Sequence, residues 1–428
     1  MSLRRVLIIT YYWPPSAGSG VQRWLKFAKY LPEYGWEPVI FTPENPDFEL
    51  KDPSLEKDIS PQLEVIKFPI WEPYGIFRKL KSAPSGDPAK ILEKKEKSVL
   101  DRLSIWLRAN LLIPDPRVFW VKPSVSFLEE AIKKGQYQAI ITTGPPHSMH
   151  LIGLRLHEKT GIPWLADFRD PWSQWEFLDT LPMLPWVRKY HRKLEQKVLM
   201  QANAITTISP TFQKDLANLA QREIHLLTNG FDGADFPKQA AVDSLKEKDI
   251  EIVYSGVIDA IRNPLPFLDA FKKAFENNSK TVRLRFVGKV SLTVEDYVKK
   301  DIWLKSHVEF VGYVSHQRVF EYYQSSDLLL LILTITKNAK GNIPGKLFEY
   351  LASGKTIIGL GNPEGDAATI INRAQAGKVF QADQVEKIIT FLQEFKPSEK
   401  AENKILIENY SRKNLSGQLA KIMEKLVQ

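Results

Sequence analysis

Short apolar segments alternate with amphipathic segments along this chain, and the alternation occurs in two separate series. The first series begins with the apolar segment Arg5–Thr10 and a helical pattern over Val21–Leu31, and the second with Ile250–Tyr254 and Pro264–Phe275. Apolar strands that alternate with helices are typical of a parallel sheet covered on both faces. The sequence therefore predicts an α/β protein with two such sheets.

A polar stretch separates the two series and sets the predicted domain boundaries. We predict an N-terminal Rossmann-like domain over residues 1–232, a linker over 233–248 and a C-terminal Rossmann-like domain over 249–410. A basic insertion near 68–122, with a helical pattern near Ile91–Asn110, interrupts the first domain. Two sheets joined by one linker imply domains that face each other across a cleft. Ligands in such folds bind beyond the carboxyl ends of the strands.

The residue types that the chain lacks exclude several classes of protein. The 428 residues include no cysteine, which excludes disulfides, thiolate metal sites and a cysteine nucleophile and fits a reducing compartment. The longest apolar runs, such as Leu328–Leu333, are far shorter than the roughly 18 residues of a membrane span. The N-terminal run lacks the cleavage site of a signal peptide. We therefore expect a cytoplasmic protein that is soluble or peripheral to a membrane.

Positive charge is concentrated in one stretch of the chain. The formal net charge is +9, and eleven basic residues oppose six acidic ones between Glu72 and Lys122. A helix there would place Leu103 and Trp106 on one face, a pattern that suits a membrane surface. We infer an anionic membrane surface as a partner of this stretch. The alternatives are a solvated basic face and a helix that packs on its own domain.

Three motifs that would indicate other chemistry are incomplete. The glycines at residues 18–20 lack the third glycine of a dinucleotide-binding fingerprint, because Arg23 stands in its place. The GKT at 354–356 lacks the earlier glycine of a P-loop and follows a helical pattern instead of a strand. His147 and His150 have no evident third ligand, and the chain has no Asp-x-Asp pair. We therefore predict neither a metal site nor a P-loop NTPase, and the sequence argues against a nicotinamide or flavin enzyme.

Predicted strand ends in the second series combine glycine with a cation. Gly256 ends one strand and Arg262 follows it, and Gly288-Lys289 ends the next strand. Lys346 and Glu349 share a face of a helix that follows a Gly/Pro loop. We expect the cations to converge on a diphosphate and Glu349 to accept two hydroxyl groups of a ribose. The alternative for Lys346 and Glu349 is a surface ion pair.

Eight short motifs are spread over nearly the whole chain. The N-terminal motifs are YYWPPSAGSG (11–20), GPPHS (144–148) and ADFRDPW (166–172). The C-terminal motifs are NGFD (229–232), YSG (254–256), VGK (287–289), VGY (311–313) and PGKLFEYLASGK (344–355). Together they resemble those of the retaining GT-B glycosyltransferases of family 4, also called glycosyltransferase group 1. The set is similar to bacterial enzymes of cell-surface polysaccharide assembly.

The resemblance implies a donor site in the C-terminal domain. It implies that Arg262 and Lys289 stabilise the diphosphate leaving group in place of a metal, and that Glu349 binds the ribose. The other donor-binding residues that it implies are Gly18, Gly20, Gly256, Gly288, Tyr313, Gly345, Lys346 and Leu347. One position departs from the family pattern, since Gly341 stands where many relatives carry a glutamate that contacts the donor sugar.

The N-terminal motifs are implied to serve the reacting sugar and the acceptor. His147 and Asp170 would be catalytic, and Arg169 and Trp172 would bind the acceptor. Many relatives carry histidine where this chain has Arg169. From the residues alone, one alternative is an internal salt-bridge cluster of Asp167, Arg169 and Asp170. For Trp172 the alternative is plain core packing.

The predicted function is a hexosyltransferase reaction with retention of configuration. The donor would be a UDP- or GDP-linked sugar, the acceptor a glycan or a lipid-linked diphosphate at the inner face of the cytoplasmic membrane, with no cofactor, metal or nucleic acid. Residues 411–428, with a helix at Leu415–Leu426, are implied to pack back on the first domain. Two alternatives remain. A nucleotide-sugar epimerase would convert donor without acceptor, and a non-catalytic nucleotide-sugar-binding protein would only bind it.

Overall fold

In the computed structural model, the structure describes residues 3–48, 50–72, 99–236, 249–259, 262–278, 281–396 and 404–428. The first part of the helix predicted near Ile91–Asn110 and most of the linker predicted at 233–248 lie outside these residues. The chain forms two units. Unit 1 comprises residues 1–228 and 412–428, and unit 2 comprises residues 229–411.

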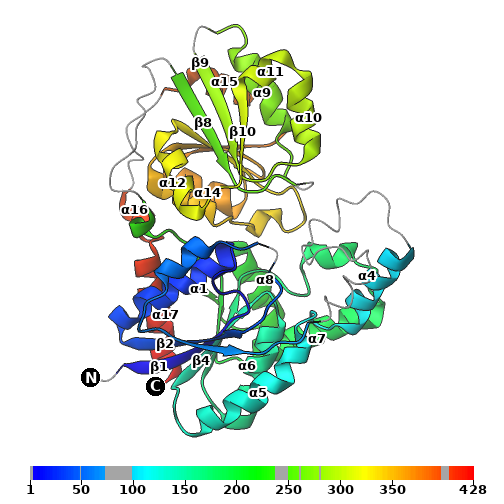
Figure 1. Cartoon of the computed structure of the whole chain (residues 1–428), viewed down its shortest axis with the longest axis vertical. Coiled ribbons are helices and arrows are strands. Elements are labelled where there is room, and N and C mark those ends of the chain that lie inside the picture. The colour runs from blue at the N-terminus through cyan, green and yellow to red at the C-terminus, as the bar shows by residue number, and fades with distance from the viewer. Residues whose placement is uncertain are drawn as a thin grey trace. The chain divides into compact units, whose positions relative to one another are not determined.

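Unit 1 is built on a parallel sheet of seven strands in the order β3-β2-β1-β4-β5-β6-β7 (Figure 1). The strands are β1 (Arg4–Ile9), β2 (Trp36–Pro43), β3 (Glu64–Phe68), β4 (Ala139–Gly144), β5 (Trp164–Phe168), β6 (Ala204–Thr207) and β7 (His225–Leu226). The chain winds outward from β1 to β3 and then from β4 to β7 in the other direction. The order therefore reverses between β1 and β4, which is where folds of this kind bind ligands.

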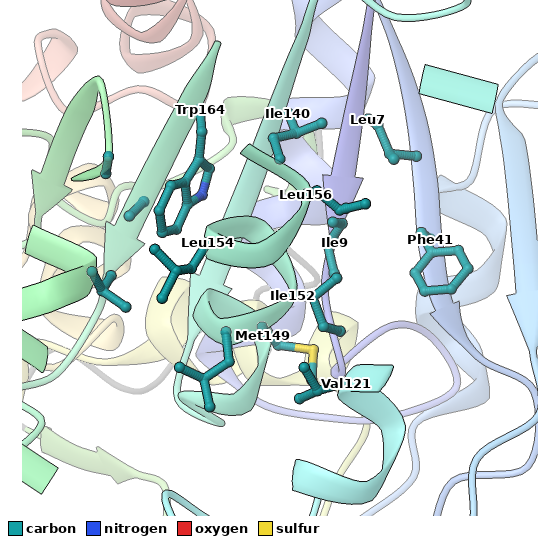
Figure 2. Packing of buried hydrophobic residues seen from close by; sticks show 14 of the residues in the cluster. Leu7, Ile9, Phe41, Val121, Ile140, Met149, Ile152, Leu154, Leu156 and Trp164 are labelled. Carbon is teal, nitrogen blue, oxygen red and sulfur yellow. The ribbon is translucent and has the colours of Figure 1, made fainter. Parts of the chain in front are cut away.

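Helices cover both faces of this sheet. The helices of unit 1 are α1 (Ser19–Tyr30), α4 (Val99–Leu111), α5 (Val118–Lys133), α6 (Ser148–Thr160), α7 (Pro185–Gln201), α8 (Pro210–Ala220) and α17 (Arg412–Leu426), with 3-10 helices η1 (Leu31–Tyr34), η2 (Pro53–Asp58) and η3 (Glu176–Thr180). Successive strand residues point to opposite faces. Leu7 and Ile9 accordingly pack in one core with α5 and α6, as Figure 2 shows, and Val6 and Ile8 pack in the other with α1 and α17.

The last helix of the chain belongs to unit 1. Leu415, Leu419 and Met423 recur at a spacing of four and are buried in the same core as Trp24 and Phe27 of α1. Figure 1 shows α17, in red, beside α1, in blue. Burying each such side chain contributes roughly 1.5–3 kcal/mol. The C-terminal end of the chain therefore stabilises the unit in which the chain begins.

Unit 2 is built on a parallel sheet of six strands in the order β10-β9-β8-β11-β12-β13. The strands are β8 (Asp249–Ser255), β9 (Thr281–Val287), β10 (Val308–Gly312), β11 (Leu328–Ile332), β12 (Thr356–Leu360) and β13 (Gly377–Phe380). The helices are α9 (Leu265–Phe275), α10 (Leu292–Lys300), α11 (Ile302–His307), α12 (His316–Ser325), α13 (Lys346–Ser353), α14 (Asp366–Arg373), α15 (Val385–Glu394) and α16 (Lys404–Glu408), with 3-10 helices η4 (Gly233–Asp235) and η5 (Ala339–Gly341). The strand order reverses between β8 and β11.

The predicted fold class is confirmed, because each unit is a Rossmann-like parallel sheet with helices on both faces. In helix α4 the side chains of Leu103 and Trp106 are 51% and 37% exposed, so the alternative that this face packs on its own domain is wrong for these two residues. The helix packs instead through Ile105 and Ala109, which are buried and lie four residues apart. Within the described ranges, no helix has the length and apolar character that crossing a membrane requires.

Candidate functional site

Three glycines follow or end adjacent strands of unit 2. Gly256, Gly288 and Gly312 have φ angles of 114°, 132° and 81°, in the region that favours glycine. Gly288 N donates to Gly312 O at 2.8 Å, and Gly256 N donates to Val287 O at 2.8 Å. A Cβ atom on Gly288 would lie 2.1 Å from Gly256 O. The three strand ends therefore present bare backbone, and at Gly288 no side chain fits.

Two basic side chains lie beside the end of β8. Lys346 Nζ donates to Ser255 O at 2.5 Å and lies 3.8 Å from the centre of the Tyr254 ring. Arg262 forms an ion pair with Asp259 at 2.6 Å. Burial and, second, the charge of Arg262 hold the pKa of Lys346 well below its ordinary value, although part of the lysine remains accessible. A bound anion would counter both effects, so the pair suits a phosphate group.

Lys289, the other predicted cation, is an exposed side chain next to Gly288. Its backbone carbonyl accepts a hydrogen bond from Ile258 N at 2.9 Å, which ties the loop after β9 to the loop after β8. Within the described residues, its ammonium group forms no ion pair. The structure thus places Lys289 at the same edge of the sheet as Arg262 and leaves its charge to solvent.

Glu349 lies in the first turn of α13, and each of its carboxylate oxygens has a partner. His316 Nε2 lies 3.1 Å from Oε1, and the Tyr323 hydroxyl donates to Oε2 at 3.1 Å. The Tyr323 hydroxyl also lies 2.7 Å from Ser255 Oγ. The Glu349 side chain is only 12% exposed, so the alternative of a surface ion pair with Lys346 is wrong. Glu349 is a fixed and partly accessible acceptor for ligand hydroxyl groups.

The other predicted donor-binding residues of unit 2 differ in accessibility. Tyr313 is 61% exposed directly after Gly312, and Gly345 is the N-cap residue of α13. Leu347 is fully buried and packs in the core, so its side chain is not available to a ligand. Gly341 is buried at the end of η5, with no side chain to offer a donor sugar.

The sequence analysis missed the hydroxyl groups beneath Glu349. The Ser255 hydroxyl lies between those of Tyr323 and Tyr350, and Tyr350 also accepts a hydrogen bond from Ser255 N at 3.0 Å. Ser255 could have been identified from the sequence, because it directly precedes Gly256 at a predicted strand end. Tyr323 and His316 could not, because they meet Glu349 only when α12 packs beside α13.

In unit 1, Gly20 and Arg169 meet where the strand order reverses. Gly18, the N-cap residue of α1, has a φ of 112°, and a Cβ atom on Gly20 would lie 2.0 Å from Arg169 Nη1. Arg169 donates to Thr143 Oγ1 at 3.0 Å and also to the Pro145 carbonyl. The guanidinium therefore covers the start of α1 and is held at the end of β4. The structure thus brings predicted residues of three N-terminal motifs together.

His147 is a buried histidine at the start of α6. Its ring is stacked on Trp172, with ring centres 4.8 Å apart and planes at 4°. The residue is 7% exposed, and neither ring nitrogen meets a partner in hydrogen-bonding geometry. Burial and, second, His150 hold the pKa of His147 well below its ordinary value, while the nearby Pro171 carbonyl acts weakly in the other direction. His147 is therefore neutral at neutral pH and retains its hydrogen-bonding capacity for a ligand.

Two aspartates near the end of β5 differ sharply. Asp167 is completely buried and accepts bonds from Arg23 at 2.8 and 3.2 Å. Its further donors are Trp24, Thr143 and Thr206. Burial acts to raise the pKa of Asp167, but the charge and bonds of Arg23 outweigh it and lower the pKa. The alternative of a salt-bridge cluster of Asp167 with Arg169 and Asp170 is therefore wrong, because the ion-pair partner of Asp167 is Arg23.

Asp170 is half-buried, and within the described residues its carboxylate forms no hydrogen bond or ion pair. Burial raises the pKa of Asp170, and the charge of Arg169 only partly opposes this shift.

Trp172 is 1% exposed, so the alternative of core packing is confirmed for its indole, which is stacked against the His147 ring. The described residues contain no group of three or more side chains that fits a metal ion.

Two family models match the chain, one in each unit. The model of the family described as glycosyl transferases group 1 matches residues 249–394, and the model of the glycosyl transferase 4-like domain matches residues 18–230. No curated protein sequence is significantly similar to the chain. The two matches together include the glycine-rich strand ends of unit 2 and the His147 region of unit 1.

Solved structures share the fold over the whole chain. Sucrose-phosphate synthase from Thermosynechococcus elongatus is 16% identical, with 99% of each chain covered and a TM-score of 0.65. Anabaena Alr3699/HepE in complex with UDP is 13% identical, with 99% of this chain and 100% of that chain covered and a TM-score of 0.65. WaaG, a glycosyltransferase involved in lipopolysaccharide biosynthesis, is 14% identical, with 97% and 99% covered and a TM-score of 0.57. At these identities the likeness establishes the GT-B fold.

Proposed function

The chain is a glycosyltransferase of the GT-B fold, and we propose that it moves a hexosyl group from a UDP- or GDP-linked sugar to a glycan or lipid-linked acceptor. We further propose that the reaction retains configuration at the transferred sugar, needs no metal and serves cell-surface polysaccharide biosynthesis. The observation that carries the proposal is the meeting of bare glycine backbone, cations and the fixed Glu349 carboxylate at one edge of the unit 2 sheet.

We assign each part of the nucleotide sugar to a group of residues in unit 2. The bare backbone at Gly256 and Gly288 admits the diphosphate, and Lys346 and Arg262 supply positive charge beside it. Glu349 accepts the ribose hydroxyl groups. The UDP in the Anabaena Alr3699/HepE structure supports a nucleoside diphosphate as the ligand of this fold.

The transfer step places charge on the diphosphate. The bond between the anomeric carbon and the phosphate oxygen breaks as the acceptor oxygen bonds to that carbon, and the electron pair of the broken bond stays on the diphosphate. The proton of the acceptor hydroxyl group passes to the departing diphosphate. In this proposal Arg262, which is held by Asp259, and the exposed Lys289 stabilise this charge. In unit 1, neutral His147 and the unpartnered Asp170 carboxylate are the groups that we assign to the reacting sugar, and Arg169 to the acceptor.

The acceptor surface that we propose lies on α4 and α7. Asn110 of α4 joins the two elements, since its Nδ2 donates to Pro182 O at 2.9 Å and its Oδ1 accepts from Leu184 N at 2.8 Å. The exposed apolar side chains of these helices include Leu103, Trp106, Leu111, Trp186 and Tyr190. Exposed cations among them are Arg102, Lys189, Arg192 and Lys193. Apolar side chains interleaved with cations suit an anionic bilayer that contains a lipid-linked acceptor at the inner membrane face.

The membrane assignment is tested by sedimentation with liposomes. We expect the wild type to bind vesicles that contain anionic lipid at low salt, and Trp186→Glu with Tyr190→Glu to abolish this binding. Ile302→Glu is the matched control, because Ile302 is 91% exposed in unit 2. Equal binding by the double variant and the control would contradict the assignment.

The donor site is tested by thermal unfolding with UDP, GDP, ADP or CDP in the presence of EDTA. A ligand at about 100 times its dissociation constant adds about 2.7 kcal/mol of stability. We expect one nucleoside diphosphate to stabilise the wild type and Glu386→Ala but not Glu349→Ala. Glu386 is a matched control because it lies, exposed, in the first turn of α15. Stabilisation by none of the four, or of the Glu349 variant as well, would contradict the proposed site.

A further inference from the structure

Helix α7 buries two polar side chains that have no part in the site described above. His191 and Glu195 lie four residues apart on the same face of the helix and are 3% and 0% exposed. Burial of a polar group costs free energy unless it forms hydrogen bonds. The partners of these two residues therefore indicate what they do.

Both residues bond to the segment that follows Asp170. Trp172 Nε1 donates to His191 Nδ1 at 3.1 Å, and Ser173 N donates to Glu195 Oε2 at 3.2 Å. The Ser173 hydroxyl donates to the same Glu195 oxygen. Because Nδ1 accepts, the proton of neutral His191 lies on Nε2. Burial lowers the pKa of His191 to about 4, so the acceptor persists at neutral pH.

The segment held by α7 in turn supports His147. The indole of Trp172 lies flat against the His147 ring at 4.8 Å and edge-on to His191, at 87°. On another side a Cβ atom on Gly144 would lie 2.9 Å from His147 Nδ1, so the backbone there is close to the ring. Neither His147 nitrogen meets a partner in hydrogen-bonding geometry, and the nearby Pro171 carbonyl acts on the ring only weakly, so packing is the main restraint on the orientation of this ring.

We propose that His191 and Glu195 are positioning residues for the transfer reaction. They fix Trp172 and Ser173, and through the stacked indole they fix the His147 ring in the orientation that the reacting sugar needs. The inference rests on the proposed function, because it assumes that His147 acts at that sugar. The same helix carries exposed Trp186 and Tyr190 on its other side, so α7 connects the proposed acceptor surface to the site.

The test uses pairs of variants that keep or remove one hydrogen-bond acceptor. His191→Asn keeps an oxygen near the position of Nδ1, and His191→Leu removes it; Glu195→Gln and Glu195→Leu form the second pair. Loss of one buried hydrogen bond is expected to lower kcat for sugar transfer about tenfold in each leucine variant. The asparagine and glutamine variants should stay within about threefold of the wild type if one acceptor suffices. The KM for the nucleotide sugar should not change, because the donor site lies in unit 2.

Proton NMR of the imidazole groups provides a readout that does not need activity. Of the seven histidines, His147 is identified by the signal that disappears in His147→Asn. The stacked indole shields its ring protons, so we expect an upfield signal in the wild type and in His191→Asn, and a downfield shift in His191→Leu. Ser173→Ala, which removes the hydroxyl donor to Glu195 but leaves the fold of α7 intact, should shift the signal in the same direction by less.

An unchanged His147 signal in both His191→Leu and Ser173→Ala would overturn the inference, as would equal kcat for the leucine variants and their conservative counterparts. A wild type that transfers no sugar from any nucleotide sugar would contradict the proposed function instead. The NMR comparison would still decide whether α7 positions His147.

Discussion

Each unit carries a carboxylate near the carboxyl ends of its strands, and the two are used in opposite ways. Asp167 in unit 1 is completely buried and saturated by donors from Arg23, Trp24 and two threonines. Glu349 in unit 2 contacts His316 and Tyr323 at 3.1 Å each, and its side chain is 12% exposed. The difference shows that similar positions on similar sheets do not imply similar roles. Solvent exposure and the number of hydrogen-bond donors determine whether a carboxylate stabilises the fold or remains available to a ligand.

The largest expected effect separates these two roles. Asp167→Ala leaves the buried Arg23 charge without its partner, so we expect it to lower the free energy of unfolding of unit 1 by about 3–5 kcal/mol. Glu349→Ala should cost no more than about 1–3 kcal/mol, because it leaves one buried hydroxyl unsatisfied. Urea unfolding followed by tryptophan fluorescence measures unit 1, since ten of the eleven tryptophans lie at or before Trp186. Equal losses in the two variants would break the comparison.

The second effect concerns the cations of unit 2, which we expect to act on rate and not on stability. Arg262→Ala and Lys289→Ala should each lower kcat for sugar transfer on the order of 10²-fold, if one cation resembles one oxyanion donor in its effect. Steady-state kinetics with a labelled nucleotide sugar measures this loss. Lys299→Ala, which removes a cation from a solvent-exposed pair on α10, is the control. Full activity of both variants would contradict the proposal that these cations stabilise the diphosphate leaving group.

The third effect sharpens the contrast between glycines. Alanine at Gly288 would place its Cβ 2.1 Å from Gly256 O at a φ of 132°, whereas a Cβ at Gly161, the C-cap residue of α6, would meet no atom within 4 Å. Both variants adopt a strained φ that costs of order 1–3 kcal/mol, but only Gly288→Ala must also displace the backbone of the donor site. We expect Gly288→Ala to lose nucleotide binding by calorimetry and Gly161→Ala to keep it. Retained nucleotide binding in Gly288→Ala would contradict the proposal that the diphosphate lies close to this backbone.

The smallest effect is a proton taken up on binding. Because the pKa of Lys346 lies well below its ordinary value in the free protein, a bound diphosphate raises it toward that value. Affinity for the nucleotide should therefore fall as pH rises through the lowered pKa, and binding below the ordinary pKa should take up a fraction of a proton. Titration calorimetry in two buffers of different ionisation enthalpy measures this uptake. Lys346→Met should abolish it, and an unchanged uptake in that variant would assign the proton to another group.

Local sequence patterns were enough to predict the fold class and the sheet edges at which the candidate site lies. Apolar runs of strand length and helical spacing are local patterns, so the predicted segments Ile250–Tyr254 and Pro264–Phe275 agree with β8 and α9 to within one residue at each end. Gly256 and Gly288 were also identified as strand ends, because a glycine after an apolar run marks the end of a strand.

The hydrogen bonds and ion pairs between polar side chains could be seen only once the elements were packed together. Arg23 and Asp167 are 144 residues apart in sequence, and Tyr323 reaches Glu349 from another helix, so no local spacing encodes either contact. The sequence allowed two roles for Trp172, stacking on a ligand or packing in the core. In the structure its indole is buried and stacked on the His147 ring. The physical reason is that periodicity fixes which face of an element is apolar, whereas hydrogen-bond partners depend on which elements that apolar burial brings together.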